Sequence, residues 1–192
     1  MNVFNILISG VGGQGVLLTS KIIAEAALRS ELDVKQSEVH GMAQRGGSVL
    51  SQVRFGKAVH SPIVSEGEAD LLIGFEPLET ARYLHYLKDQ GAVIYNTRPI
   101  GTIGVSTAAE KYPVDLGGVI KSRAATVVPL DGTELAVKAG DKRTLNLVLL
   151  GAALAFLPFK EETVVQAIEQ TVPPKVLEIN RRAFAAGRSS GA

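Results

Sequence analysis

The chain has 192 residues, of which 46% are hydrophobic and 20% are charged, a length and balance that suit one folded domain. Twenty basic and 19 acidic residues leave a net charge of +1, which provides no overall field to hold a nucleic-acid backbone. No cysteine is present, so disulfides, thiolate catalysis and cysteine-bound iron–sulfur clusters are excluded on this chain.

The first half of the chain alternates between predicted strands and a helix. Residues 3–9 are a nearly continuous apolar run that ends at glycines, the pattern of a strand buried on both faces. Residues 16–30 carry apolar side chains at helical spacing. Two further strands are predicted at 33–39 and 48–55, and the glycine-rich loop 41–47 between them has no apolar periodicity.

The next segments repeat this alternation. Residues 69–75 (ADLLIGF) predict a buried strand, and Glu76-Pro77 opens a helix that we expect to end at Gly91, before a strand at 92–96. Such a succession predicts an α/β, Rossmann-like fold, in which a mostly parallel sheet is covered by helices on both faces.

The C-terminal part is predicted to be a helical segment. A strand at 126–130 precedes a helix that Asp131 caps and that runs through Lys138, and helices are expected at 145–157 and 161–172. Pro173-Pro174 interrupt the chain before a last helix that reaches Ala186. We expect one domain over residues 1–187, with a frayed, flexible tail that begins at Gly187 and covers 188–192.

Nothing in the sequence predicts a membrane span or a targeting segment. The most apolar run, residues 147–159, is 13 residues long, whereas a span needs about 20. The first residues show no basic region followed by a cleavage site. We therefore expect a cytoplasmic protein without a membrane partner.

The motif G-x-G-x-x-G occupies residues 10–15 (GVGGQG), directly after a predicted strand and before a predicted helix. In that context the first glycine permits a tight turn, the second lets a phosphate approach the backbone, and the third lets the helix pack on the sheet. Free N–H groups and the helix dipole favour an anion there. The candidate cofactor-binding residues are Gly10, Gly12, Gly13, Gln14 and Gly15. A tight turn that binds nothing is the alternative.

Two nucleotide-binding motifs compete for this glycine turn. Gly10 and Gly15 have the spacing of a Walker A loop, but Val16-Leu17 replace its Lys and Ser/Thr, which excludes ATPase chemistry by that route. A dinucleotide-binding fold needs an acidic residue about 20 residues further on. Glu38, at the end of the second predicted strand, is available, so NAD(P) binding stays open.

A second loop follows that strand, at the sheet edge where open α/β sheets bind ligands, and we expect it to lie beside the glycine turn. The guanidinium of Arg45, flanked by Gly46-Gly47, suits a carboxylate or phosphate. The alternative is a pair between Arg45 and Glu38 that closes the loop. The candidate cofactor-binding residues here are Gln44, Arg45, Gly46 and Gly47. No catalytic residue is assigned, and the three widely separated histidines predict no metal site.

With both loops in view, the sequence resembles the small, gamma-type subunits of 2-oxoacid:ferredoxin oxidoreductases. GVGGQG followed by an R-G-G loop is their shared frame, and EVHGMAQRGG at 38–47 resembles the beta subunit of the indolepyruvate branch, whereas the pyruvate and 2-oxoglutarate branches usually carry a G-P-E-x-R-G form. Further matches are VRFG at 53–56, EGEADLLIGFEPLE at 66–79, NLVLLGA at 146–152 and NRRAFAAG at 180–187. Residues 98–141 are the part of the chain that resembles the family least.

The resemblance implies an oxidoreductase subunit that is inactive alone. Enzymes of this family decarboxylate a 2-oxoacid on thiamine diphosphate, pass two electrons through iron–sulfur clusters to ferredoxin, and deliver the acyl group to coenzyme A. It also implies that thiamine diphosphate and the clusters belong to a large partner subunit, that ferredoxin is met only indirectly, and that this chain contributes coenzyme A binding and active-site closure. The cysteine-free composition agrees with that division.

Three alternatives remain at this point. The chain could be a free-standing NAD(P)-binding oxidoreductase, although no histidine or tyrosine–lysine constellation for proton transfer is visible. It could be the gamma subunit of a pyruvate or other 2-oxoacid branch. It could also be a non-catalytic docking module whose glycine turn is empty.

Overall fold

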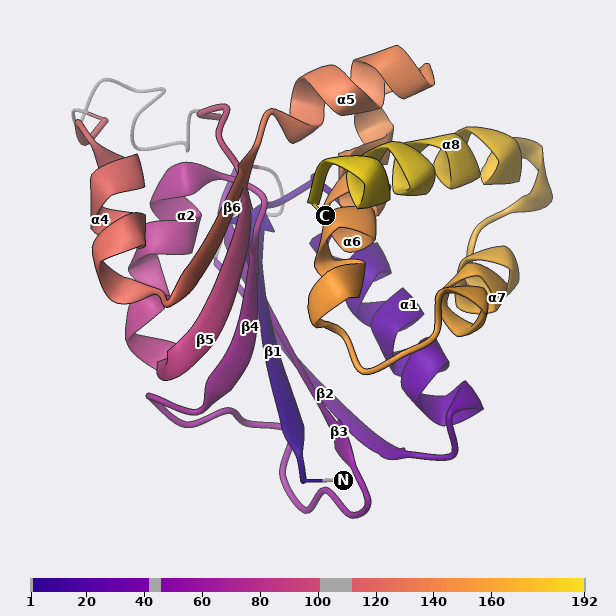
Figure 1. Cartoon of the computed structure of the whole chain (residues 1–192), viewed down its shortest axis with the longest axis horizontal. Helices are drawn as coiled ribbons and strands as arrows, with labels where there is room; N and C mark the ends of the chain where they lie inside the picture. Colours follow the sequence, from indigo (N-terminus) through magenta and orange to yellow (C-terminus); the bar gives the residue numbers. More distant parts are fainter. Residues whose placement is uncertain (1, 42–45, 101–111, 192) are drawn as a thin grey trace.

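The strands of the computed structural model form one sheet in the order β2-β3-β1-β4-β5-β6, with helices on both faces (Figure 1). The structure describes residues 2–41, 46–100 and 112–191. The strands within these ranges are β1 (Phe4–Val11), β2 (Asp33–His40), β3 (Ser48–Gly56), β4 (Ala69–Gly74), β5 (Leu87–Asn96) and β6 (Thr126–Leu130). The helices are α1 (Val16–Arg29), α2 (Pro77–Arg82), α4 (Leu116–Arg123), α5 (Gly132–Ala139), α6 (Leu145–Ala153), α7 (Glu161–Thr171) and α8 (Pro174–Gly191).

The sheet is mostly parallel, as predicted, and β3 is the strand that differs. β1, β4, β5 and β6 pair in parallel, whereas β3 is antiparallel to both β1 and β2. A short loop joins β2 to β3, and strands joined in this way pair as an antiparallel hairpin. The hairpin inserts β3 between β2 and β1. The carboxyl ends of β1 and β2 therefore lie at the same edge of the sheet.

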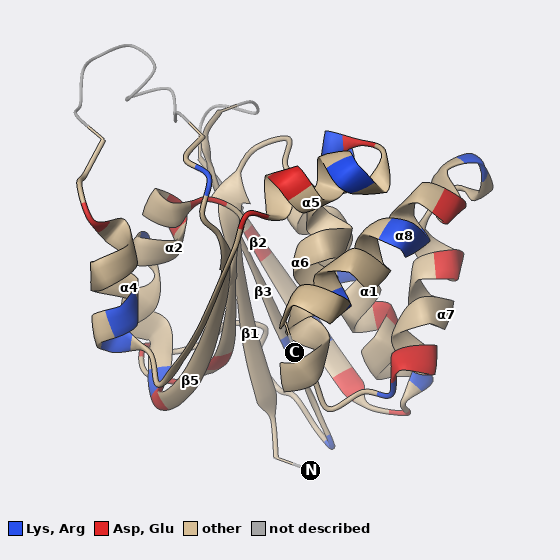
Figure 2. Ribbon diagram, turned by 45° about the horizontal axis from the view of Figure 1, so that its top comes forward, with Lys and Arg blue, Asp and Glu red and all other residues tan. Residues whose placement is uncertain are grey.

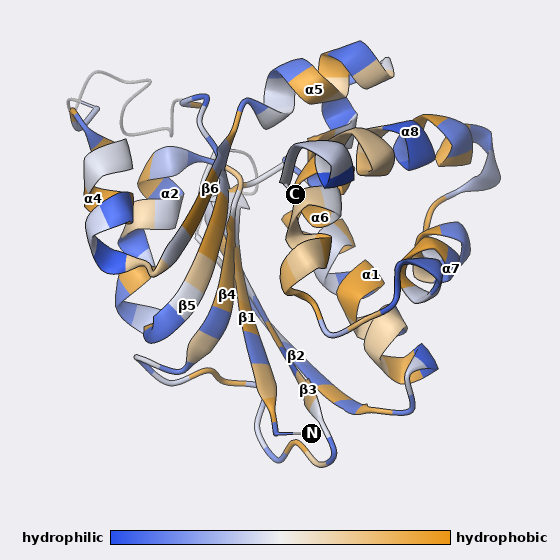
Figure 3. Cartoon of the chain, viewed as in Figure 1, coloured by the Kyte–Doolittle hydropathy of each residue, from blue (hydrophilic) through white to orange (hydrophobic). Residues whose placement is uncertain are grey.

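Alternate side chains of each central strand enter two different cores. On β1, Ile6 and Ile8 pack toward α1, α6, α7 and α8, while Leu7 packs toward α2 and α4, and all three are 0% exposed. This alternation follows from the two-residue period of a strand. Each such aliphatic side chain contributes about 1.5–3 kcal/mol on burial. Figure 3 shows hydrophobic residues concentrated in the sheet and on the helix faces that cover it.

Charged residues are spread over the helices and turns. Figure 2 shows Lys and Arg interspersed with Asp and Glu, as the net charge of +1 implies. Ion pairs such as the half-buried Arg29–Glu25 and the exposed Lys138–Glu134 link neighbouring turns of a helix.

The last helix packs against α6 at backbone contact. All nine residues of α6 are buried, and α8 lies across it. A Cβ built on Gly187 would lie 1.9 Å from the Val148 carbonyl oxygen, and one on Gly151 would lie 2.1 Å from that of Phe184. Only glycine allows this approach, because any side chain would push the two helices apart.

The helix expected from residue 76 to Gly91 is wrong in its second half. α2 ends at Arg82, a 3₁₀ turn covers Leu84–Tyr86, and β5 already begins at Leu87. The register between β4 and β5 shifts between Ala69 and Leu71, so a polar stretch of β5 is displaced from the ladder. A Cβ on Gly91 would lie 2.5 Å from Leu87 Cγ, so this glycine permits a bulge and does not end a helix.

The C-terminal boundaries also differ from expectation. α8 continues to Gly191, so the frayed tail expected from Gly187 is wrong: Gly187 is buried against α6. α6 ends at Ala153, and the 3₁₀ turn Leu154–Phe156 follows it. The single domain over 1–187 stays a prediction.

Among the described residues, no helix combines the length and apolar character that crossing a membrane requires.

Candidate functional site

The glycine turn lies at the carboxyl end of β1, as predicted, with Gly10 still inside the strand. β1 ends at Val11 and α1 begins at Val16. A Cβ on Gly10 would lie 2.8 Å from Phe75 Cβ and 2.9 Å from Val16 Cγ2. Gly10 thus lets the ends of β1 and β4 pack against the start of α1.

Gly13 and Gly15 have positive φ angles, but their surroundings differ. Gly13 has a φ of 100° and nothing within 4 Å of the place where a Cβ would stand. Gly15 has a φ of 95°, and its Cβ would lie 3.0 Å from Cβ and Cγ of Asn146 on α6. Gly15 therefore seats α1 against α6, whereas Gly13 faces open space beside the turn.

Gln14 braces the turn from inside. Its Oε1 accepts a hydrogen bond from Val11 N at 2.5 Å, and its Nε2 donates to the Phe75 carbonyl at 3.1 Å. The buried Asn96 at the end of β5 donates to the same carbonyl at 3.2 Å. The connection after β1 packs on one face of the sheet and that after β4 on the other, the usual switch-point crevice of an open sheet. Gln14 spans this crevice, so the space open to a ligand is beside the turn and not within the crevice.

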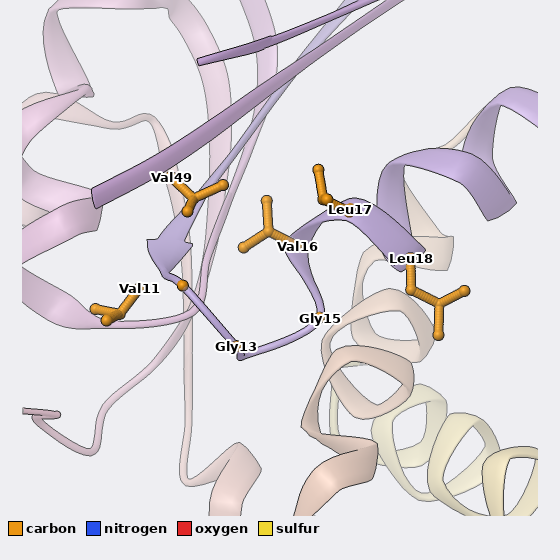
Figure 4. Close-up of a pocket in the computed structure, with 8 residues that line it drawn as sticks. Val11, Gly13, Gly15, Val16, Leu17, Leu18 and Val49 are labelled. Carbon is orange, nitrogen blue, oxygen red and sulfur yellow. The ribbon is translucent and has the colours of Figure 1, made fainter. Parts of the chain in front are cut away.

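The start of α1 offers backbone donors to a cavity of about 370 Å³. Gly15 caps α1 without a side-chain hydrogen bond, and the first turn holds no acidic residue, so the positive end of the helix dipole is not offset there. Backbone N–H groups could hold an anion there, while apolar side chains cover the wall (Figure 4). The lining consists of Gly12, Gly13 and Gly15 with Val11, Val16, Leu17, Leu18 and Val49.

A second cavity, of about 270 Å³, also borders the turn at Gly13 and Gln14. Its wall includes Thr133, Lys142 and Arg143, from the first turn of α5 and the 3₁₀ turn before α6. The Arg143 side chain is 81% exposed and pairs with Asp141 at 2.5 Å. Sequence reasoning missed this basic pair, because only the fold brings residues 142–143 beside residues 13–14.

The second loop lies beside the glycine turn, and this prediction is confirmed for its described part. Gly12 N donates to the Gly47 carbonyl at 2.9 Å, and Gly41 N donates to the Ser48 carbonyl at 2.8 Å. Gly46 has a φ of 77°, which glycine adopts without strain. Gln44 and Arg45 lie outside the described residues, and so does the expected alternative of a pair between Arg45 and Glu38.

The position of Glu38 weakens the case for a dinucleotide. In a dinucleotide-binding fold the strand that carries the ribose-binding acid is the neighbour of β1. Here β3 separates β2 from β1, which places Glu38 two strands away, at roughly 10 Å across the sheet.

Two buried carboxylates lie under the second loop, and sequence reasoning gave them no role. Glu76 is 0% exposed, caps α2 by accepting from Glu79 N at 2.9 Å, and accepts a hydrogen bond from the Tyr112 hydroxyl. Glu79 is 1% exposed and accepts from Ser48 Oγ at 2.5 Å. Burial raises the pKa of the Glu79 carboxyl. Since Ser48 is the first residue of β3, Glu79 holds the base of the second loop.

The described part of the chain contains no group of three His, Cys, Asp or Glu side chains placed to hold a metal ion. The candidate site is therefore a glycine turn, a glycine loop beside it, an apolar cavity and a basic one.

The family model described as pyruvate ferredoxin/flavodoxin oxidoreductase matches residues 5–190. A Methanothermobacter thermautotrophicus protein named indolepyruvate oxidoreductase subunit IorB is 40% identical and is aligned over 98% of each chain. The protein of the same name from Thermococcus kodakarensis is 41% identical over 97% of this chain and 95% of its own. Relatives named for ketoisovalerate, pyruvate/ketoisovalerate and 2-oxoglutarate enzymes share 27–30%.

A solved structure has the same fold over the whole length. The crystal structure of the gamma subunit of a keto/oxoacid ferredoxin oxidoreductase from Geobacter sulfurreducens superposes with a TM-score of 0.73, at 25% identity and over 98% of each chain.

Proposed function

The chain belongs to the pyruvate ferredoxin/flavodoxin oxidoreductase family, and from that membership we propose that it is the small, gamma-type subunit of an enzyme that oxidises indolepyruvate or a related arylpyruvate with ferredoxin as electron acceptor. The subunit supports a thiamine-dependent oxidative decarboxylation that ends in an acyl-CoA. The iron–sulfur clusters are assigned to a large partner subunit, since this chain has no cysteine to ligate a cluster. Thiamine diphosphate is assigned to the same subunit because the family resemblance implies it. The proposal places the enzyme in the cytoplasm.

One observation carries the choice of branch. Relatives named for indolepyruvate share 40–42% identity with the chain over nearly its full length, whereas relatives named for other 2-oxoacids share 27–30%. A pyruvate-branch gamma subunit is the competing assignment.

The substrate panel of a reconstituted enzyme tests this choice. The chain is co-purified with the large thiamine-binding subunit from the same organism, and ferredoxin reduction is followed with indolepyruvate, phenylpyruvate, pyruvate and 2-oxoglutarate. We expect kcat/KM to be at least about 100-fold higher for the two aryl substrates, because a pocket built for a ring loses its apolar contacts with a small acid. A preference for pyruvate or 2-oxoglutarate would overturn the assignment.

Within this function, the chain contributes part of the coenzyme A site at the glycine turn. Coenzyme A joins phosphate groups to a long, weakly polar arm. The turn borders an apolar cavity with free helix N–H groups and a second cavity with Lys142 and Arg143. This combination suits both halves of the ligand, since backbone N–H groups and basic side chains bind phosphates and the valine and leucine wall accepts the arm. We assign Gln44, Arg45, Gly46 and Gly47 to the same coenzyme A site and to active-site closure, as the resemblance implies.

Paired variants test the coenzyme A assignment in the assembled enzyme. Gly12→Val obstructs the backbone and Arg45→Ala removes the guanidinium. The control Arg181→Ala removes an exposed cation of α8 that pairs with Glu169 and lines neither cavity at the glycine turn. We expect Gly12→Val and Arg45→Ala each to raise the KM for coenzyme A at least about tenfold, the size of effect expected when one hydrogen bond to a charged group is lost. The control Arg181→Ala should leave this KM unchanged. An unchanged KM in the Gly12→Val, Arg45→Ala double variant would show that coenzyme A binds elsewhere.

A further inference from the structure

A cavity of about 310 Å³ lies on the other face of the sheet, between the start of α2, the carboxyl end of β5 and the start of α4. It shares no lining residue with the two cavities at the glycine turn. We name it the tyrosine pocket, after Tyr95 and Tyr112 in its wall. Nothing in the proposed chemistry of the glycine turn uses it.

Tyr95 brings to this pocket a hydroxyl that pairs with no described residue. The residue is 5% exposed, and its hydroxyl makes no hydrogen bond to any described residue. A Cβ on Gly117 would lie 3.4 Å from that hydroxyl, which places it at the first turn of α4. The hydroxyl therefore opens onto the pocket, where a polar group that enters can hydrogen-bond to it in place of water. We take this free hydroxyl as the polar end of the pocket.

The charges around the tyrosine pocket select a cation. Asp115 adopts a left-handed φ of 59° and caps α4, since its Oδ1 accepts from Gly118 N at 3.0 Å, and Oδ2 is left for another donor. Glu76 lies buried behind Tyr112. The described lining contains no Lys or Arg: Arg98, between two lining residues, turns away to Asp131 at 3.2 Å. The remaining oxygen of Asp115 and the Tyr95 hydroxyl are two acceptors at one pocket, and together they suit a positively charged donor with several N–H groups.

The shape and the rim select a protein side chain. Pro77, Pro99 and Leu116 give the pocket flat apolar walls, which suit an aliphatic stem and a planar guanidinium. Val114 is 94% exposed beside the pocket, and Val119 on α4 is 48% exposed. A free small molecule would leave these valines in water, whereas a protein segment would cover them. Arginine anchors in apolar surroundings are typical of interface hot spots.

We propose that the tyrosine pocket docks an arginine side chain of the large partner subunit, with the guanidinium hydrogen-bonded to Asp115 and Tyr95 and the flanking chain covering Val114. This inference rests on the proposed function only for the identity of the partner. Arginine is favoured over lysine because its planar fork of donors serves both acceptors at once.

The affinity of the purified large subunit for variants of this chain tests the proposal. Asp115→Asn keeps the cap and tolerates the left-handed backbone but removes the charge, and Tyr95→Phe removes only the hydroxyl. The matched controls are Asp89→Asn, in the exposed bulge of β5, and Tyr86→Phe, in the same core. We expect Kd to rise about tenfold or more for Asp115→Asn and about three- to tenfold for Tyr95→Phe, and to stay within about twofold for the controls.

Each other outcome has a meaning. Unchanged Kd values for both pocket variants, with a wild-type complex that forms and turns over, overturn the docking proposal and leave the proposed function standing. Failure of the wild-type chain to bind the large subunit contradicts the proposed function itself. Variants that lower the self-association of this chain, and not its binding to the large subunit, would assign the pocket to a second copy.

A crosslink identifies the occupant directly. A photo-crosslinking residue in place of Val114, in the purified two-subunit complex, is expected to label a large-subunit segment with an arginine within a few residues of the linkage. Label in a segment without a basic residue overturns the assignment to arginine. The same probe in place of Leu28, which is 57% exposed on α1 on the other face of the sheet, is the control and is expected not to label that segment.

Discussion

Substituting alanine at three glycines separates the ligand-binding role of the glycine turn from its role in folding. Gly13, Gly15 and Gly67 all have positive φ, at 100°, 95° and 73°. Gly13 and Gly67 have nothing within 4 Å of the added Cβ, whereas at Gly15 the Cβ would lie 3.0 Å from Asn146. Gly13 borders both cavities of the candidate site, and Gly67 lines none of the cavities described.

The expected free energies follow from these surroundings. Alanine at a positive φ costs about 1–3 kcal/mol, of which about 0.4–1 kcal/mol is recovered because the unfolded chain is less flexible. Gly13→Ala and Gly67→Ala should therefore each lower the free energy of unfolding by about 1–2 kcal/mol. Gly15→Ala adds the contact with Asn146, and overpacking of this kind costs about 1–3 kcal/mol more.

Two assays read out the two roles. Urea unfolding measures the free energy of unfolding. We expect equal values for Gly13→Ala and Gly67→Ala and a clearly lower value for Gly15→Ala. The KM for coenzyme A in the assembled enzyme is expected to rise at least about tenfold for Gly13→Ala, because the methyl group stands where the phosphate would meet the backbone. It should not change for Gly67→Ala. Equal coenzyme A KM values for these two variants would refute the reasoning.

Three further predictions concern the framework of the site. Gly187→Ala places a Cβ 1.9 Å from the Val148 carbonyl and should destabilise the chain by about 3 kcal/mol or more, measured by urea unfolding; wild-type stability would show that α6 and α8 separate freely. Gln14→Leu leaves the Val11 N–H without its acceptor and should cost about 1–3 kcal/mol, and a loss below about 0.5 kcal/mol would contradict its bracing role. For Glu79, burial raises the folded pKa above the unfolded value of 4.5, so the native state holds more protons between the two values and loses stability as pH rises. Glu79→Gln should therefore gain in stability relative to the wild type as pH rises above 4.5, measured by urea unfolding across a pH series, and a constant difference would remove Glu79 as the titrating group.

The parts of the site that the sequence predicted are those governed by local rules. A glycine turn between a strand and a helix has one plausible position, at the carboxyl end of β1. The second loop was expected beside it because strands of one direction end at one edge, and the hydrogen bond from Gly12 to Gly47 confirms this. The insertion of β3 between β1 and β2 was not predicted, since apolar patterns mark a strand and not its neighbours.

The parts that were missed depend on contacts between distant segments. Ser48 and Glu79 are 31 residues apart, and Glu76 and Tyr112 are 36 apart, so no local spacing indicates that they meet. Lys142 and Arg143 reach the glycine turn only through the position of α6 on the sheet. The end of α2 was predicted wrongly for a different reason. The polar residues before Gly91 continue a helical pattern, but in the structure they form a bulge of β5 opposite Ala69.

The measurement that tests the central claim most directly is ferredoxin reduction with indolepyruvate and coenzyme A, by this chain alone, by the large subunit alone, and by the two mixed in increasing ratio. The account predicts no turnover for this chain, little for the large subunit, and full activity that saturates when the two are equimolar. Turnover by this chain alone, or a large subunit whose activity does not change when the chain is added, would contradict it.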